Sequence, residues 1–76
     1  MVIGEIEKNM LEKIIVSIQY YEGRELIDIR VYVENSKREL IPTKKGISTT
    51  FDKVDALLSL IEKAKKSKKR NSVMRG

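Results

Sequence analysis

A chain of 76 residues has room for one domain, and so short a chain buries only a modest core when it folds alone. It contains no cysteine and no histidine, which excludes disulfides, thiolate metal sites and the commonest general base of enzymes. The net charge of +5 is unevenly placed, because residues 1–62 carry 9 basic and 11 acidic side chains whereas residues 63–76 carry 7 basic side chains and no acidic one.

The N-terminal third of the chain predicts a strand followed by a hairpin. Residues 2–7 alternate weakly and predict a short first strand, which residues 8–12 connect to the hairpin. Residues 14–21 and 24–33 are rich in Ile, Val and Tyr and form the hairpin's two strands. Glu22-Gly23 is the loop between them, since glycine allows a positive φ; a one-residue bulge is the alternative.

A two-residue loop sorts the hairpin's side chains onto two faces. Opposing residue numbers then add up to 45, so that Ile18 faces Ile27. The face that we call the apolar face, which we expect to be buried, carries Ile14, Val16, Ile18, Ile27, Ile29, Val31 and Val33. The polar face carries Ser17, Gln19, Tyr21, Arg24, Leu26, Asp28, Arg30 and Tyr32.

A fourth strand and a helix complete the chain. Residues 34–37 predict a polar turn, and residues 38–41 predict a strand that Pro42 interrupts and residues 47–49 complete. Pro42 predicts a bend or an edge there, because proline cannot donate a ladder hydrogen bond. Thr50 is the expected helix N-cap. The helix is predicted by an apolar stripe at helical spacing, Phe51, Val54, Leu57, Leu58, Ile61 and Ala64.

The predicted fold class is therefore α+β, a four-stranded antiparallel sheet followed by one C-terminal helix, in the order β-β-β-β-α. Four strands are about 19 Å wide at ~4.8 Å spacing, and one helix covers only about 10 Å of that width. A second copy is expected to cover the remainder, which predicts a two-fold homodimer. We divide the chain into a binding domain, residues 1–64, and a basic, disordered tail, residues 65–76.

Catalysis has little support in these residues. No metal-ligand cluster, phosphate loop or dinucleotide fingerprint is present, so no catalytic residue, metal or cofactor is predicted. Ser17 and Asp28 lie opposite each other and are expected to form a cross-strand hydrogen bond rather than a nucleophile–base pair.

The polar face carries the sharper signal for binding. Tyr21 and Tyr32 offer rings on which bases stack, and Arg24 and Arg30 offer guanidinium groups that pair with phosphates. A solvated sheet surface is the plain alternative, and the pattern alone does not separate the two. Two interpretations of the basic tail also stay open: a solubilising end of the chain, or a surface that binds polyanions.

The hairpin and the following strand resemble a known family. The run IIVSIQYYEGRELIDIRVYVENSKRELIPTKKGIST, residues 14–49, is similar to the single-stranded-DNA-binding domain of the transcriptional coactivator family called positive cofactor four. The most specific parts are Leu26–Arg30, LIDIR, and Lys44–Ser48, KKGIS, at the family's spacing. The resemblance extends over roughly residues 2–62.

The resemblance implies a dimer in which each subunit has a curved sheet, with helices at the interface and single-stranded DNA across the concave side. The implied stacking residue is Tyr21, and the implied basic contacts are Arg24, Arg30, Lys44 and Lys45. The family's second stacking aromatic falls on Val33, which implies either weaker stacking or the use of Tyr32 or Tyr20 in its place.

The predicted function is single-stranded DNA binding with low sequence specificity, in transcription regulation or in replication and repair, with the transcription machinery as a further partner. Two alternatives stay open: an RNA-binding regulator, and an adaptor whose basic tail binds acidic proteins. The protein is expected to have no membrane role, and to be cytoplasmic and nucleoid-associated in a prokaryote or phage or nuclear in a eukaryote.

Overall fold

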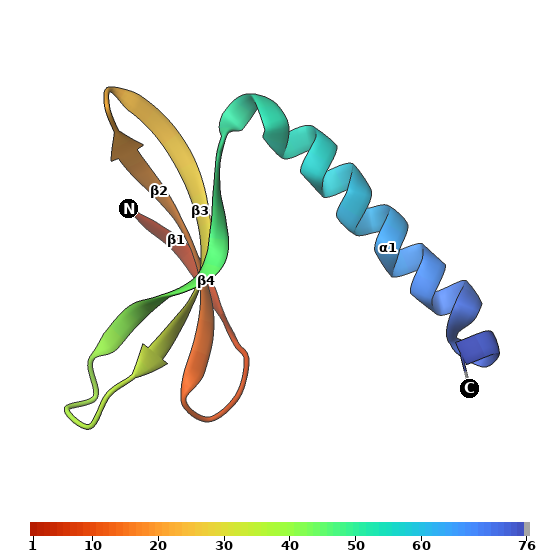
Figure 1. Ribbon diagram of the computed structural model, residues 1–76, viewed down its shortest axis with the longest axis horizontal. Helices are drawn as coiled ribbons and strands as arrows, with labels where there is room; N and C mark the ends of the chain where they lie inside the picture. The colour runs from red at the N-terminus through yellow and green to blue at the C-terminus, as the bar shows by residue number, and fades with distance from the viewer. Residues whose placement is uncertain (76) are drawn as a thin grey trace.

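The computed structural model describes the backbone of residues 1–75 and the side chains of residues 1–68. Four strands, β1 (Val2–Glu7), β2 (Glu12–Tyr21), β3 (Arg24–Glu34) and β4 (Leu40–Thr50), form one antiparallel sheet in the order β1-β2-β3-β4. A single 3₁₀ turn, Phe51–Lys53, leads into the helix α1 (Val54–Arg75). Figure 1 shows a curved, open sheet with α1 leading away from it, so the predicted α+β order is confirmed.

The central hairpin has the register that the sequence predicts. Ile18 is the Cα partner of Ile27, and Tyr21 is the partner of Arg24. The loop has two residues and no bulge, since Glu22 has φ 53° and Gly23 has φ 77°. Two successive positive φ angles are those of a type I′ turn, whose twist matches that of the strands it joins.

β4 departs from regular pairing at the point where Pro42 predicts a bend. Gly46 pairs with Arg30 and Pro42 pairs with Tyr32, so three residues of β4 oppose one residue of β3. The bulge is anchored by the Thr43 hydroxyl, which donates to the Val31 carbonyl at 2.8 Å. Gly46 is required for the close approach beside it, because an added Cβ would lie against the Ile29 carbonyl oxygen and 2.8 Å from the Arg30 Cα.

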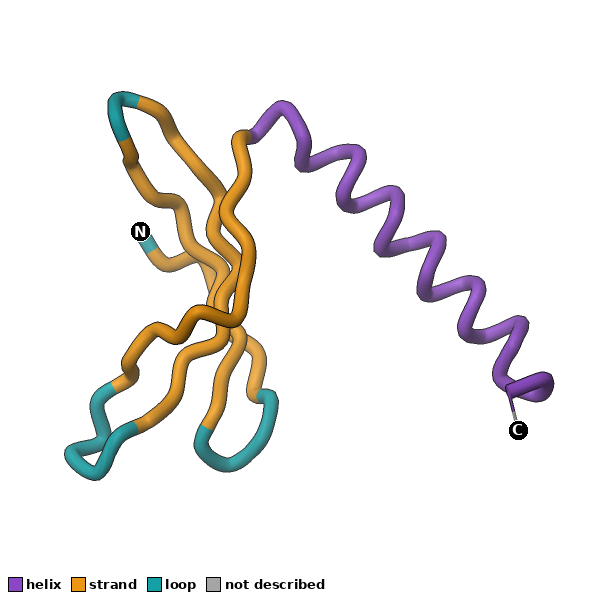
Figure 2. The backbone as a smooth tube through the Cα atoms, in the orientation of Figure 1, coloured by secondary structure: helices purple, strands orange, loops and turns teal. Residues whose placement is uncertain are grey.

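Burial in the single chain differs from the expectation that the apolar face is covered. Within residues 1–68, the buried residues are Ile15, Ser17 and Asp28, all on the side of the polar face. The apolar face is only half-buried along its central strands. The reason is that no second layer lies over it, because α1 turns away from the sheet (Figure 2).

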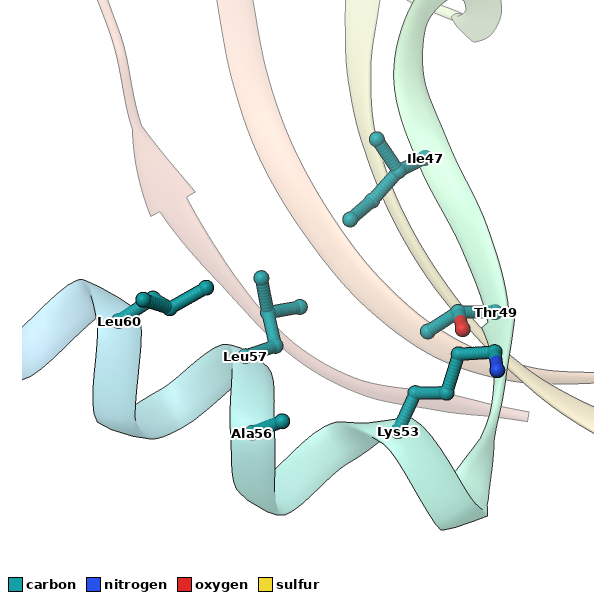
Figure 3. Close-up of a pocket in the computed structure, with 6 residues that line it drawn as sticks. All are labelled: Ile47, Thr49, Lys53, Ala56, Leu57 and Leu60. Atoms are coloured by element: carbon teal, nitrogen blue, oxygen red, sulfur yellow. The ribbon is translucent and has the colours of Figure 1, made fainter.

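Only the first turns of α1 approach the apolar face. Figure 3 shows Leu57 and Ala56 of α1 facing Ile47 and Thr49 of β4 across a shallow apolar groove. Farther along the helix, Leu58, Leu60 and Ile61 are each more than half exposed. Thr50 precedes the helix as predicted, but its side chain makes no capping hydrogen bond.

The end of the helix bears on the predicted division of the chain. α1 continues through residues 65–75, part of the segment predicted to be a disordered tail, while Gly76 and the side chains beyond Lys68 lie outside the described residues. The boundary at residue 64 stays a prediction. No helix of the described residues is both long enough and apolar enough to cross a membrane.

Candidate nucleic-acid interface

The tip of the hairpin places an aromatic ring beside a cation. Tyr21 and Arg24 are direct partners at either side of the turn, and the Tyr21 ring is 64% exposed. Arg24 is exposed, and among the side chains of residues 1–68 it forms no ion pair. The tip therefore presents an exposed aromatic ring and a guanidinium without an ion pair side by side.

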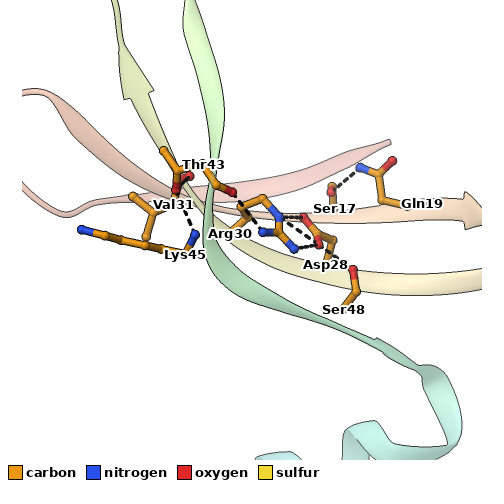
Figure 4. Close-up of polar contacts among 8 residues, drawn as sticks. All are labelled: Ser17, Gln19, Asp28, Arg30, Val31, Thr43, Lys45 and Ser48. Atoms are coloured by element: carbon orange, nitrogen blue, oxygen red, sulfur yellow. Dashed lines mark hydrogen bonds and ion pairs between the residues drawn. The ribbon is translucent and has the colours of Figure 1, made fainter.

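The centre of the polar face is a closed polar network rather than an open surface (Figure 4). Arg30 donates from Nε to both carboxylate oxygens of Asp28 at 3.2 Å and from Nη2 to Oδ1 at 2.9 Å. Its Nη1 donates to the Thr43 carbonyl at 3.0 Å, which connects β3 to the bulge of β4. The Ser48 hydroxyl donates to Asp28 Oδ1 at 2.6 Å.

This network corrects two expectations. Arg30 is predicted to contact phosphates from an open face, but its side chain is only 23% exposed and three of its nitrogens already donate within the chain. Ser17 and Asp28 are Cα partners as predicted, yet the Asp28 hydrogen bonds come from Arg30 and Ser48. The Ser17 hydroxyl instead accepts a hydrogen bond from Gln19 at 2.7 Å.

The ionisation of Asp28 is set by two opposing effects. Burial alone raises the pKa of a carboxyl group, but hydrogen bonds from Arg30 and Ser48 and the Arg30 charge outweigh it and hold the pKa of Asp28 below its ordinary value. Asp28 therefore stays ionised and neutralises Arg30, which reduces the positive charge that the centre of the face offers to a phosphate.

Of the remaining predicted residues, Tyr32 and Lys44 lie toward the far end of the polar face, whereas Lys45, predicted to contact the ligand there, does not lie on this face. Tyr32 is half-buried and lies eight residues beyond Arg24 on β3, which is about 27 Å along the strand. By alternation between Pro42 and Gly46, Lys44 points to the polar face and Lys45 to the other side. The Lys45 charge acts on Glu12, whose pKa is lowered first by hydrogen bonds from Asn9 and Lys8 and then by nearby lysine charges.

The two long edges of the polar face differ in charge. On β1, Glu5 and Glu7 pair with Ile15 and Lys13 and so lie on the polar side. Lys13 is neutralised there by Glu5 at 2.9 Å, a hydrogen-bonded contact that also raises the pKa of Lys13. The β1 edge is consequently acidic, whereas the β3–β4 side carries the basic residues.

Some of these residues could be located from the sequence, but their contacts could not be predicted from it. Ser48 lies opposite Asp28, but this could not be seen because the two additional residues in β4 hide the register. The charge of the β1 edge was visible in principle, since Glu5 and Glu7 alternate at strand spacing within residues 2–7. Within the described part of the chain, no three His, Cys, Asp or Glu residues are grouped so as to hold a metal ion.

Comparison with protein families gives one match. Residues 8–60 match the family described as Transcriptional Coactivator p15 (PC4). No curated protein sequence matches the chain significantly.

Solved structures give the same family. Two crystal forms of a PC4 homolog from Burkholderia pseudomallei are 25% identical to this chain, with TM-scores of 0.81 and 0.82. The matches cover 86% of this chain and 88% and 96% of theirs. A bacteriophage T5 homolog of the eukaryotic transcription coactivator PC4, implicated in recombination-dependent DNA replication, matches in fold over 100% of this chain and 96% of its own, with TM-score 0.62 and 20% identity.

Proposed function

Because the chain belongs to the PC4 family of transcriptional coactivators, as its resemblance to positive cofactor four predicted, we propose that it is a DNA-binding protein that holds single strands with little sequence preference. The role is binding in transcription or replication, with no catalysis. The observation that carries the proposal is the exposed Tyr21 ring beside the unpaired Arg24 on the polar face.

The charge distribution supports one path for the strand. Phosphates are repelled by Glu7 on β1, which forms no ion pair among the described side chains, and attracted by Arg24 and Lys44 on the opposite side of the face. The strand accordingly runs along β3 and β4 and reaches Tyr21 at the hairpin tip. Backbone contacts and ring stacking do not distinguish one base from another, which accounts for low sequence preference.

A single strand fits this surface better than a duplex. An exposed tyrosine ring contributes by stacking on an unpaired base, and that base face is occupied by neighbours in a duplex. The central network of Asp28 and Arg30 is already satisfied internally, so the free cations are few and lie toward the ends of the face. Stacking at Tyr21 thus weighs more in the affinity than phosphate pairing at the centre.

The proposal includes a homodimer, which the surface area of the single chain supports. The chain exposes 6703 Å², whereas a compact monomer of 8.8 kDa exposes about 4,800 Å². Its radius of gyration is 15.3 Å, against about 11 Å for a compact domain of this length. A second copy that packs on the half-buried apolar face and on the exposed Leu58, Leu60 and Ile61 would remove part of this excess area.

The test compares two adjacent tyrosines. Tyr21→Ala should weaken binding of an oligothymidine by about 1–3 kcal/mol with nearly unchanged salt dependence, because it removes a ring and no cation. Tyr20→Ala is the matched control, since Tyr20 is 75% exposed and its register puts it on the opposite side of β2.

The measurement is fluorescence anisotropy over a range of salt, with duplex DNA and RNA of one sequence as competitors and sedimentation to check the oligomeric state. Equal affinities for the two variants would refute the assignment of the polar face. Tighter binding of the RNA than of the single-stranded DNA would assign the face to RNA instead.

A further inference from the structure

The distal half of α1 carries positive charge alone. Lys63, Lys65, Lys66 and Lys68 are exposed, and no carboxylate among the side chains of residues 1–68 pairs with them. In the sequence, the seven basic residues after Glu62 are accompanied by no acidic residue. We call residues 63–68 the lysine segment.

The lysine segment is separate from the polar face. α1 leads away from the sheet along its whole course (Figures 1 and 2), and Lys63 lies nine residues, about 14 Å, from the start of the helix. At about 100° per residue the four lysines point to several sides of the helix rather than to one. A strand on the polar face of the same chain therefore leaves the lysine segment free for a second ligand.

The chemistry of the segment identifies that ligand. No aromatic residue follows Phe51, so the segment has nothing on which an unpaired base stacks. Lysine side chains recognise charge and not base identity. Duplex DNA has a higher linear charge density than a single strand, with one phosphate charge per about 1.7 Å of helix axis. An α-helix also fits the major groove of B-form DNA, whereas the deep, narrow major groove of A-form RNA does not admit side chains.

We propose that the lysine segment is a second nucleic-acid site, one that binds the phosphate backbone of duplex DNA. The protein then has two surfaces of different selectivity, and it holds a boundary between single-stranded and duplex DNA more tightly than either part alone. The inference goes beyond single-strand binding and stands on different residues, so the two proposals fail separately.

The experiment replaces all four lysines by glutamine, and by arginine in a matched control. Glutamine keeps helix propensity and length but removes the charge, and arginine keeps the charge. Circular dichroism checks the helix in both variants. The probes are a blunt DNA duplex, an oligothymidine, and the same duplex carrying the oligothymidine as a tail, measured by anisotropy at several salt concentrations.

The glutamine variant should bind the blunt duplex at least about tenfold more weakly, with a salt slope lower by about three to four per chain. It should also lose the preference of the parent for the tailed duplex over the oligothymidine, while oligothymidine binding itself changes less than about twofold. The arginine variant should behave as the parent. Tyr21→Ala should leave duplex binding unchanged.

Three results would overturn the proposal. Unchanged duplex binding by the glutamine variant would show that the lysine segment does not contact DNA. An equal loss for oligothymidine and duplex would assign the segment to the single strand. Binding of an RNA duplex or of polyglutamate as tight as that of the DNA duplex would show that the surface is not selective for duplex DNA.

Discussion

Replacing Asp28 by asparagine tests whether the centre of the polar face is structural. Asp28 is 6% exposed and accepts hydrogen bonds from Arg30 and Ser48. Asparagine retains one acceptor oxygen and turns an amide N–H₂ toward donors, so at least one charge-assisted hydrogen bond is lost and a guanidinium remains without its counter-charge.

The expected cost is about 2–3 kcal/mol of unfolding free energy. Breaking a fully buried ion pair costs about 3–5 kcal/mol. We expect a smaller cost here because the Arg30 side chain is 23% exposed, so that water partly solvates the guanidinium left without its counter-charge. The Thr43 carbonyl still accepts from Arg30 Nη1, so the guanidinium retains one partner.

The assay is urea unfolding at one fixed protein concentration, since the stability of an oligomer depends on concentration. Glu5→Gln is the matched control, because the Glu5–Lys13 pair lies on the same side of the sheet but remains in contact with water. If Asp28→Asn lowers the unfolding midpoint no more than Glu5→Gln does, the network does not stabilise the fold and the argument from its burial fails.

Two further outcomes follow from the same structure. Leu58→Asp should dissociate or unfold the proposed dimer, because it puts an unpaired charge on the exposed apolar side of α1. The control Ser59→Asp should keep a mass twice that of the chain in sedimentation equilibrium, and a dimeric Leu58→Asp variant would contradict this interface. Because the pKa of Asp28 is lowered in the folded state, ionised Asp28 stabilises the fold above the ordinary carboxyl pKa of about 3.9, and this stabilisation is lost as the pH falls through the pKa of the folded state. The unfolding free energy should therefore fall less steeply with decreasing pH for Asp28→Asn than for the parent. Parallel curves would show that Asp28 does not cause this dependence.

The elements set by local chemistry were predictable from the sequence. Alternating Ile, Val and Tyr defined β2 and β3, and Glu22-Gly23 fixed a two-residue loop, so the register and the two faces followed together. Pro42 marked the bend in β4 because proline cannot donate to the ladder. Tyr21 and Arg24 were placed correctly, since both lie within two residues of that loop.

What depended on contacts distant in the sequence was not predictable. The number of additional residues in the β4 bulge decides whether Ser48 meets Asp28, and nothing in residues 40–50 states that number. Arg30 looks like any solvated strand arginine until the Thr43 carbonyl and the Asp28 carboxylate are placed around it. The departure of α1 from the sheet is equally invisible, because an apolar stripe predicts burial without identifying the partner that supplies it.

Under the proposed function, the polar face divides between residues that stabilise the fold and residues that contact DNA. At its centre, Asp28, Arg30 and Ser48 use their hydrogen-bonding capacity within the chain, so a loss of DNA binding on mutation there reports the fold as much as the ligand. At its ends, Tyr21, Arg24 and Lys44 are exposed and can be changed with little effect on folding. Substitutions at Tyr21 and Lys44 therefore test the proposed binding by this face, and substitutions in the lysine segment test the proposed binding by the helix. The unfolding of Asp28→Asn is the reference for structural damage.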